Sequence, residues 1–322
     1  MRRLRTGPCD RPAHPAWPGR RRPAWLAVLA GLLTLLTGCG LGTAPPGAGT
    51  GSAATSGPGA AGSRAVPRPR HVVVVIFENR AYGQIIGNPQ AGYFNQLARS
   101  GALFTASYGV THPSQPNYLA LYSGGTHGIT GDQCLAHPLA APNLGSELAA
   151  AGLTFTGFAE SLPGGGARIC DQGNYARKHV PWSDFSDIPP AVSKPMSAFP
   201  RQNYGRLPTV SFVIPNLCSD MHDCSVATGD AWLRANLGGY ARWAMSHDSL
   251  LIVTFDEDDS MHHNRIATIF VGQQVRPGRY SRSITHYNVL RTIEQAYGLR
   301  YLGRSAAAYP ISWIWRPATP AS

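Results

Sequence analysis

Short apolar runs recur along most of the chain and alternate with stretches of helical periodicity. The run from His71 to Phe77 holds four consecutive valines, as is typical of a strand covered on both faces. Similar runs span residues 155–159, 210–214, 250–255 and 266–271, and helical patterns span residues 144–151, 232–245 and 287–297. This alternation predicts an α/β fold with three layers, in which helices cover both faces of a mostly parallel central sheet.

Polar side chains follow three of these apolar runs directly. In such sheets, ligands collect outside the carboxyl ends of the strands, so these side chains should share one edge. Each one alone is most simply a helix cap or a solvated loop residue. Together, their carboxylate and amide oxygens suit a divalent cation and favour a metal site. The residues concerned are Glu78, Asn79, Asp220, His222, Asp256 and Glu257.

A serine flanked by prolines, Ser114, lies just before a short helical pattern at residues 119–122. A hydroxyl held near the positive end of a helix is well placed for the charge of an alkoxide or a phosphate. Serine is a poor nucleophile at its ordinary pKa, and a bound cation would lower that pKa. We therefore expect Ser114 to be an exposed nucleophile beside the metal, with a structural helix cap as the alternative.

The first seventy residues have a different composition from the rest. Arg20–Arg22 precede an apolar run, Trp25–Leu36, that is too short for a permanent membrane span, so residues 1–38 are predicted to be a signal peptide. The following Cys39 resembles the lipidated cysteine of a bacterial lipobox, although it could be incidental to an ordinary secretory signal. Residues 39–70 are mostly Gly, Ala, Pro, Ser and Thr, which predicts a flexible tether before a catalytic domain at 71–322.

The net charge of +11 belongs mainly to these N-terminal segments. Residues 71–322 carry 18 basic and 16 acidic side chains, so a nucleic-acid-binding surface is not indicated. The same part holds four cysteines, which an oxidising compartment would pair. Three pairings are possible, and we favour Cys134 with Cys170 and Cys218 with Cys224. A zinc site is less favoured because no close Cys-x-x-Cys pair occurs.

Several motifs occur in one order between residues 71 and 300. Together they resemble the bacterial phosphoesterase family of secreted acid phosphatases, phosphoinositide 3-phosphatases and phospholipases C, within the alkaline phosphatase superfamily. The resemblance covers essentially the whole predicted catalytic domain and implies an alkaline phosphatase-like fold. The motifs are Phe77-Glu78-Asn79-Arg80, His112-Pro113-Ser114-Gln115-Pro116-Asn117-Tyr118, Pro215-Asn216 with Asp220-Met221-His222-Asp223, Phe255-Asp256-Glu257-Asp258, Asn264-Arg265-Ile266 and His286-Tyr287.

The resemblance implies a role for each matching residue. Ser114 would become phosphorylated, and Asn117 would donate a hydrogen bond to a phosphate oxygen. His222 or His286 would protonate the leaving alkoxide, with His112, His262 and His263 as weaker candidates. The metal-binding positions would be Glu78, Asn79, Asp256 and Glu257, and Asp220, His222 and His286 fall where relatives hold a second metal or polar groups around the leaving group.

The number and identity of the metal ions stay partly open. Two-metal relatives have Asp-His where this chain has Asp256-Glu257, so one hard cation is expected rather than a dizinc centre. Magnesium, manganese, calcium and zinc all remain candidates.

The resulting prediction is a metal-dependent phosphomonoesterase that acts on a phosphate ester, with a phospholipid as one candidate, while attached to the membrane through Cys39. A phospholipase C-type phosphodiesterase is the first alternative, which Ser114 disfavours because those enzymes resemble each other in having threonine there. A non-catalytic substrate-binding lipoprotein is the second. Loops 135–142 and 161–198 are expected to wall the pocket. Their cations Arg168, Arg177 and Lys178 are expected to be solvated surface charges, with phosphate binding as the alternative.

Overall fold

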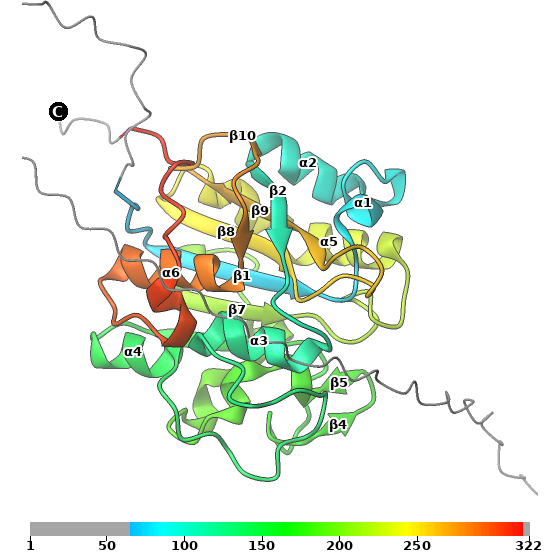
Figure 1. The fold of residues 1–322 in the computed structure, drawn as a ribbon, viewed down its shortest axis with the longest axis vertical. Coiled ribbons are helices and arrows are strands. Elements are labelled where there is room, and N and C mark those ends of the chain that lie inside the picture. The colour runs from blue at the N-terminus through cyan, green and yellow to red at the C-terminus, as the bar shows by residue number, and fades with distance from the viewer. Residues whose placement is uncertain (1–64, 318–322) are drawn as a thin grey trace, which may run out of the picture. The chain divides into compact units, whose positions relative to one another are not determined.

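The computed structural model describes residues 65–317, and a nine-stranded sheet forms its centre (Figure 1). Its strands follow the order β10-β2-β9-β8-β1-β7-β3-β6, with β11 beside β2. They span His71–Phe77 (β1), Ala102–Tyr108 (β2), Phe155–Ala159 (β3), Ser193–Pro195 (β6), Val210–Ile214 (β7), Ser249–Phe255 (β8), Arg265–Gly272 (β9), Gly278–Tyr280 (β10) and Ile284–Thr285 (β11). The predicted α/β class is confirmed.

The middle of the sheet is parallel. Strands β8, β1, β7, β3 and β6 run in one direction, and β9 lies antiparallel between β8 and β2. Because Phe77 pairs with Phe255 at the ends of β1 and β8, the residues that follow these two strands emerge side by side. This register places Glu78 next to Asp256 at one edge of the sheet.

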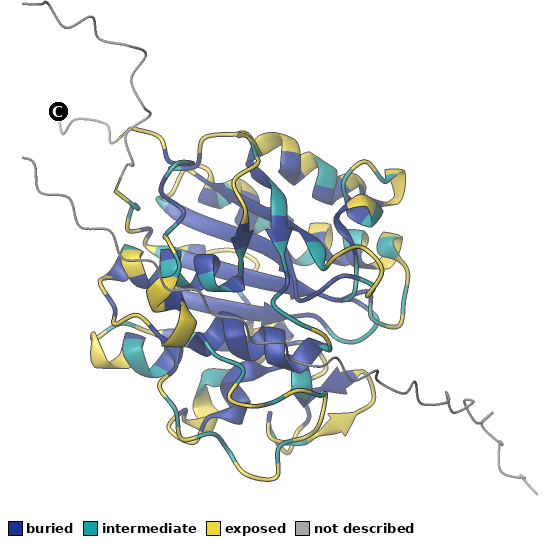
Figure 2. Ribbon diagram, viewed as in Figure 1, coloured by how far each residue is buried: buried dark blue, intermediate teal, exposed yellow. Residues whose placement is uncertain are grey.

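Helices cover both faces of the sheet, as predicted (Figures 1 and 2). One face carries α2 and α5, with α1 at its rim, and the other carries α3, α4 and α6. Alternate side chains of β1 serve the two layers: Val74 packs toward α3 and α6, and Val75 packs toward α2 and α5. The helices span Tyr82–Ile85 (α1), Gly92–Ser100 (α2), Ser114–Ser123 (α3), Leu144–Ala150 (α4), Val226–Ala244 (α5) and His286–Tyr297 (α6).

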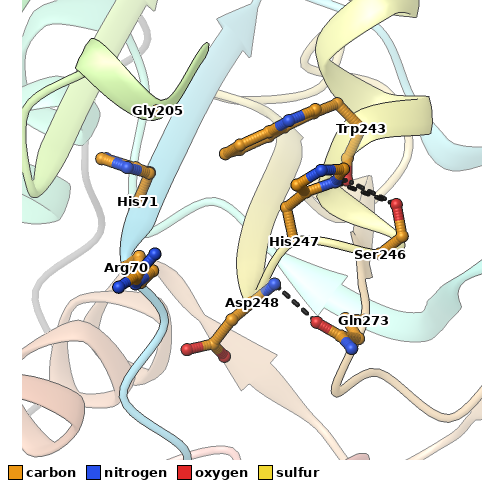
Figure 3. A pocket seen from close by; sticks show the side chains of 8 residues that line it. All are labelled: Arg70, His71, Gly205, Trp243, Ser246, His247, Asp248 and Gln273. Carbon is orange, nitrogen blue, oxygen red and sulfur yellow. Dashed lines mark hydrogen bonds between the residues drawn. The ribbon is translucent and has the colours of Figure 1, made fainter. Parts of the chain in front are cut away.

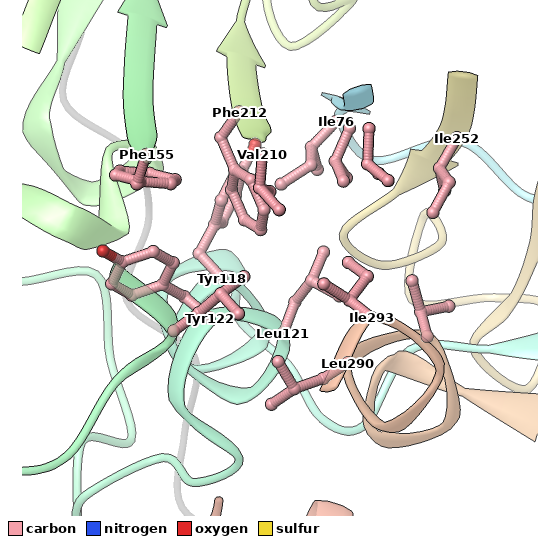
Figure 4. Packing of buried hydrophobic residues seen from close by; sticks show 14 of the residues in the cluster. Ile76, Tyr118, Leu121, Tyr122, Phe155, Val210, Phe212, Ile252, Leu290 and Ile293 are labelled. Carbon is pink, nitrogen blue, oxygen red and sulfur yellow. The ribbon is translucent and has the colours of Figure 1, made fainter. Parts of the chain in front are cut away.

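The core beneath α3 fixes the position of that helix. Tyr118, Leu121 and Tyr122 of α3 are fully buried against the sheet and against α6 (Figure 4). Burying side chains of this size stabilises the fold by about 1.5–3 kcal/mol each. The first turn of α3, which begins at Ser114, is therefore held rigidly at the edge of the sheet.

Long loops beside β3 complete the domain. They contain a small hairpin of β4 (Asp171–Gln172) and β5 (Tyr175–Ala176) and several short 3₁₀ turns. Both favoured disulfides are present: Cys134 pairs with Cys170, and Cys218 pairs with Cys224. The loops are thus covalently closed near the catalytic edge.

The packed domain begins slightly before the predicted boundary at residue 71. Val66 packs against the core, and Pro69 is buried and accepts a hydrogen bond at 2.8 Å from the Tyr297 hydroxyl. The predicted signal peptide and Cys39 lie outside the described residues. Within residues 65–317, no helix is both long enough and apolar enough to span a bilayer.

The sequence did not predict α1, α2, β2 or the short strands β4, β5, β6, β10 and β11, and it predicted α3 and α5 too short. Strand β2 mixes apolar with small polar residues, and α2 has polar residues on its outer face, so neither stands out as an apolar run. Helix α5 begins at Val226 rather than Trp232, because the Ser225 side chain caps it by accepting from the Thr228 N–H at 3.2 Å.

Candidate active site

The loop before α3 is held by an amide of the helix itself. The Asn117 Oδ1 accepts from the backbone N–H groups of Val110 and Thr111, and its Nδ2 donates to the carbonyls of Thr111 and Pro113. In the structure, Asn117 therefore shapes the turn that presents Ser114. Its predicted donation to a phosphate oxygen stays a prediction.

The Ser114 hydroxyl points at two carboxylates. Its Oγ donates to Glu78 Oε2 at 3.0 Å and to Glu257 Oε1 at 3.1 Å. The expectation of an exposed hydroxyl is wrong, since Ser114 is only 2% exposed. The physical reason is that the ends of β1 and β8 enclose the first turn of α3.

Four carboxylates crowd together beneath Ser114, and all are buried: Glu78, Asp220, Asp256 and Glu257. Burial, followed by the charges of Asp256 and Asp220, raises the pKa of Glu78 well above its ordinary value. Burial and then the charge of Glu257 raise the pKa of Asp256 to about 8. Burial likewise raises the pKa values of Asp220 and Glu257 to about 7 each. So much buried negative charge calls for a compensating cation.

The donor set fits a hard divalent cation. Asp256 Oδ2 and Asp220 Oδ2 are buried and have no hydrogen-bond partner among residues 65–317, which is costly for carboxylate oxygens unless a cation contacts them. The Asn79 amide joins the group, because its Nδ2 lies 3.2 Å from Glu78 Oε2 and its backbone N–H donates to Asp256 Oδ1. Oxygen donors of this kind match the predicted divalent cation and leave its identity open.

A buried imidazole that the sequence analysis missed, His179, lies in the same cluster. It stacks on Tyr118 with ring centroids 5.1 Å apart. Its Nε2 is 3.3 Å from Glu78 Oε1, and its Nδ1 is 3.3 Å from Asp220 Oδ2. Burial, with the Lys178 charge, holds its pKa well below the usual range, so the ring is neutral and can bind a metal. Within residues 65–317, Glu78, His179 and His222 form one of two groups that could hold a metal ion.

A lysine also faces the cluster. Lys178 Nζ pairs with Asp132 Oδ2 at 2.8 Å and lies 3.5 Å from His222 Nε2. Burial alone would lower the pKa of this ammonium, but the Asp132 carboxylate outweighs burial and raises it. Asp132 in turn accepts from the backbone N–H of Gln115, next to Ser114. The cluster thus includes a positive charge at its open side.

The expected solvated role of the nearby cations is wrong for Arg177 and Lys178. The Arg177 side chain is buried and pairs with Asp184 at 2.8 Å, and the Lys178 side chain is only 19% exposed. Arg168 is exposed and donates to the carbonyl of Phe185. Residues 177–179 lie in a long loop, so no helical or strand periodicity marks them. The sequence signal for this segment is the run Arg177-Lys178-His179 itself.

The two predicted acid histidines occupy different environments. His222 is partly exposed, and its Nδ1 lies 2.7 Å from Asp223 Oδ1, which leaves Nε2 on the side of Lys178. His286 is buried, and its Nε2 donates to the backbone carbonyl of Asp256 at 2.6 Å. Burial lowers the pKa of His286 to about 4, so this ring is neutral and holds the end of β8 in place.

The adjacent residues Glu257 and Asp258 contact different groups. His112 Nδ1 lies 2.5 Å from Glu257 Oε2, on the oxygen that Ser114 does not contact. The buried Asp258 accepts from the backbone N–H groups of Ser260, His262 and Asn264. Asp258 therefore organises the following loop. The exposed His262 pairs with Asp259 at 2.6 Å, and His263 is also exposed.

Cavities lie at both edges of the sheet. One of about 640 Å³ is lined by Arg70, His71, Trp243 and His247, among others (Figure 3). These residues stand where β1 and β8 begin, at the edge opposite the carboxylates, so this cavity takes no part in the candidate site. Another of about 590 Å³ is lined by residues 81–83, 261–263, Tyr108 and Arg265, beside the carboxylate cluster.

A serine hydroxyl that contacts a buried carboxylate cluster, at the edge of a mostly parallel α/β sheet, suits a phosphoric ester hydrolase. A profile of the Phosphoesterase family matches residues 88–300, and the chain belongs to this family. Glu78 and Asn79 precede the matched range, and the other predicted site residues fall within it.

Two curated relatives agree with this assignment. The chain is 55% identical over 252 residues to a phosphatidylinositol-3-phosphatase of Mycobacterium tuberculosis, covering 78% of this chain and 84% of that protein. It is 26% identical over 227 residues to a phosphate-repressible acid phosphatase of Penicillium chrysogenum, covering 65% of this chain and 55% of that enzyme. The aligned segment therefore spans about half of the fungal enzyme.

Solved structures share the fold. An alkaline phosphatase superfamily protein from Vibrio parahaemolyticus superposes with a TM-score of 0.52 at 13% identity, over 76% of this chain and 71% of that one. The murine ectonucleotide pyrophosphatase/phosphodiesterase 5 superposes with a TM-score of 0.50 at 11% identity, over 72% and 96% of the two chains. The alkaline phosphatase-like fold is thus confirmed.

Proposed function

We propose that this phosphoesterase is a metal-dependent phosphomonoesterase in which Ser114 is the nucleophile. The observation that carries the proposal is the Ser114 hydroxyl, held within 3.1 Å of two members of a buried carboxylate cluster. Glu78, Asn79, Asp256 and Glu257 would hold one divalent cation, and Asp220 and His179 of the same cluster could also contribute ligand atoms. The cation, when bound, would lower the pKa of the serine hydroxyl and neutralise the phosphate oxygens.

The chain's own residues supply the remaining steps. Ser114 Oγ gives up its proton to one of the two carboxylates that it contacts and attacks phosphorus, the ester P–O bond breaks, and the displaced alkoxide takes a proton. We assign that proton to His222, whose Nε2 faces the site while Asp223 orients the ring. Lys178 lies beside His222 and would contact a phosphate oxygen. Water then attacks the phosphoserine and releases inorganic phosphate and the free hydroxyl of Ser114.

A monoester substrate is favoured over a diester. The relatives named above are a phosphatidylinositol-3-phosphatase and an acid phosphatase, and both names describe removal of a terminal phosphate. Lys178 and His222 also lie at the open side of the site. The positive charge of Lys178 there favours a monoester, which carries more negative charge than a diester. A phosphoinositide is the substrate that we propose, and a phospholipase C-type diester is the second candidate.

Replacing Ser114 with Ala tests the nucleophile. Turnover of p-nitrophenyl phosphate should fall by at least about a thousandfold, because the covalent step disappears. The free energy of unfolding should fall by only about 1–3 kcal/mol, since a single buried donor is lost. A parallel assay on bis-p-nitrophenyl phosphate tests the diesterase alternative. Assays of the parent enzyme after chelation, and after each metal is returned, test the metal dependence. Turnover within about tenfold of the parent would contradict the proposal.

Lipidation at Cys39 is a separate part of the proposal and rests on the sequence. Acylation would provide about 0.8 kcal/mol of membrane affinity per buried CH₂ group. Cys39→Ser should therefore move the protein from the detergent phase to the aqueous phase in a partitioning experiment. Equal partitioning of parent and variant would mean that Cys39 is only part of a cleavage site.

A further inference from the structure

Two cavities meet at one tyrosine beside the candidate active site. The first, of about 590 Å³, and the second, of about 490 Å³, share Tyr82, which begins α1 four residues after Glu78. The first also includes Tyr108 at the end of β2 and Arg265 at the start of β9. All three positions lie at the sheet edge that carries the carboxylates. A substrate whose phosphate group reaches Ser114 would therefore extend toward this groove, which we call the Tyr82 groove.

Arginines dominate the charge of the Tyr82 groove. The Arg265 guanidinium lies 4.2 Å over the Tyr82 ring, and Arg279 Nη2 donates to the Tyr82 hydroxyl at 3.0 Å. Arg99 lines the second cavity as well. No carboxylate is among the lining residues of either cavity in the described part of the chain, although Asp259 pairs with His262 nearby. Such a surface complements an anionic ligand.

The second cavity adds apolar surface to these cations. Ile86, Ala98 and Leu103 line it together with Arg279. A small, fully hydrated phosphate ester would gain nothing from this apolar wall. A ligand with both a phosphate and hydrocarbon fits it better.

The rim of the groove bears a protruding methionine. Met261 is 78% exposed, well above the next exposed large apolar side chain, Met245 at 42%. Its loop is fixed, because the buried Asp258 carboxylate accepts three backbone N–H groups, and Ser260, His263 and Asn264 adopt positive φ angles. The loop therefore holds Met261 outward at the edge where the carboxylates lie.

We propose that the Tyr82 groove docks an anionic phospholipid within a bilayer. Arg265 and Arg279 bind the lipid's phosphodiester, Met261 enters the headgroup layer, and the terminal monoester reaches Ser114. This inference rests on the proposed phosphomonoesterase function and names its substrate class. A free, water-soluble headgroup is the competing ligand, and the experiment below distinguishes it from the lipid.

The test compares substrates on the full-length chain carrying Cys39→Ser, so that no acyl anchor contributes to vesicle binding. Substrates are phosphatidylinositol 3-phosphate in phosphatidylcholine vesicles, soluble inositol 1,3-bisphosphate, and p-nitrophenyl phosphate. Met261→Ser should lower kcat/KM on vesicles about tenfold relative to p-nitrophenyl phosphate. Arg279→Gln should lower it about fivefold by the same measure. Met245→Ser and Arg201→Gln are the matched controls, since Met245 ends α5 at the opposite edge and Arg201 is exposed away from the groove.

Each outcome decides the proposal. The proposal would be overturned if the ratio of kcat/KM on vesicles to kcat/KM on p-nitrophenyl phosphate were the same in these variants as in the controls. It would also be overturned if Met261→Ser lost as much activity on soluble inositol bisphosphate as on vesicles, because the groove would then bind a free headgroup. Sedimentation of the Ser114→Ala chain with the same vesicles separates docking from catalysis. If that chain binds vesicles in a Met261-dependent way while the parent hydrolyses no monoester, the groove stands and the proposed function fails.

Discussion

At the scale of single residues, buried acids outside the candidate site also shape this protein. Glu294 of α6 is fully buried, and Ser305 Oγ and the Leu302 backbone N–H donate to it. Burial raises its pKa to about 7, against an ordinary value of 4.5, although these hydrogen bonds act in the opposite direction. The folded protein therefore holds a proton on Glu294 at pH values where the unfolded chain has lost it.

This difference makes stability depend on pH with a definite sign. Below about pH 4.5 both states are protonated, and between about pH 4.5 and 7 the folded state binds more protons, so its stability falls as pH rises. Glu294→Gln imitates the neutral acid and should remove this part of the decline. The free energy of unfolding should be measured in urea at pH 5 and at pH 8. From pH 5 to pH 8, the parent should lose at least about 1 kcal/mol more of this free energy than Glu294→Gln does.

The exposed Asp171 provides a control for the loss of one acidic side chain. Asp171→Asn should keep the parent's pH dependence. If Glu294→Gln follows the parent in the same way, Glu294 is ionised in the fold and the assigned protonation is incorrect.

At the scale of elements, a buried ion pair joins α3 to the loop that carries Lys178 and His179. Arg177 contacts Asp184 Oδ1 through both Nε and Nη2, at 2.9 and 2.8 Å, while Gln115 donates to Asp184 Oδ2 at 3.1 Å. Gln115 is the neighbour of Ser114. The first turn of α3, which carries Ser114, and the cationic side of the site therefore share one buried connection.

Asp184→Asn should damage both stability and catalysis. It leaves the Arg177 guanidinium buried without its counter-charge, which should cost about 3 kcal/mol of unfolding free energy. It should also lower kcat, because Lys178 and His179 lose their fixed position. Glu147→Gln is the matched control, since it breaks the exposed pair with Arg300, whose side chain is 66% exposed, and should cost under about 1 kcal/mol. Equal effects of the two substitutions in urea unfolding would show that the buried pair is not a stabilising connection.

The same elements show what sequence can and cannot predict here. The ranges of β1, β3 and β7 match the predicted runs residue for residue, because a strand buried on both faces is mostly apolar along its whole length. The carboxylates after β1 and β8 were found because strand ends mark them. Asp132 and His179 were missed because they lie on loops, whose path depends on long-range contacts such as the Arg177–Asp184 pair.

At the scale of the whole molecule, the start of the folded domain can be located by truncation. Val66 and Pro69 pack on the core, and Arg68 lies 5.7 Å over the Tyr297 ring. A chain that starts at residue 71 loses these contacts and two hydrogen bonds, those of the Pro69 carbonyl and of the Arg70 backbone N–H, about 2 kcal/mol in total. Its Tm should be about 4–8 °C below that of a chain that starts at residue 65. Identical calorimetric midpoints would place the boundary at residue 71, as the composition predicts.

The two disulfides bear on when this enzyme becomes active. Cys218–Cys224 closes the loop that contains Asp220 and His222, and Cys134–Cys170 lies against Arg177, whose backbone N–H donates to the Cys170 carbonyl at 2.8 Å. Both crosslinks thus fix segments that carry proposed catalytic groups. A chain in a reducing environment lacks these crosslinks, so we expect its site to be complete only after oxidation. The activity of this enzyme would then depend on the redox state of the compartment that holds it.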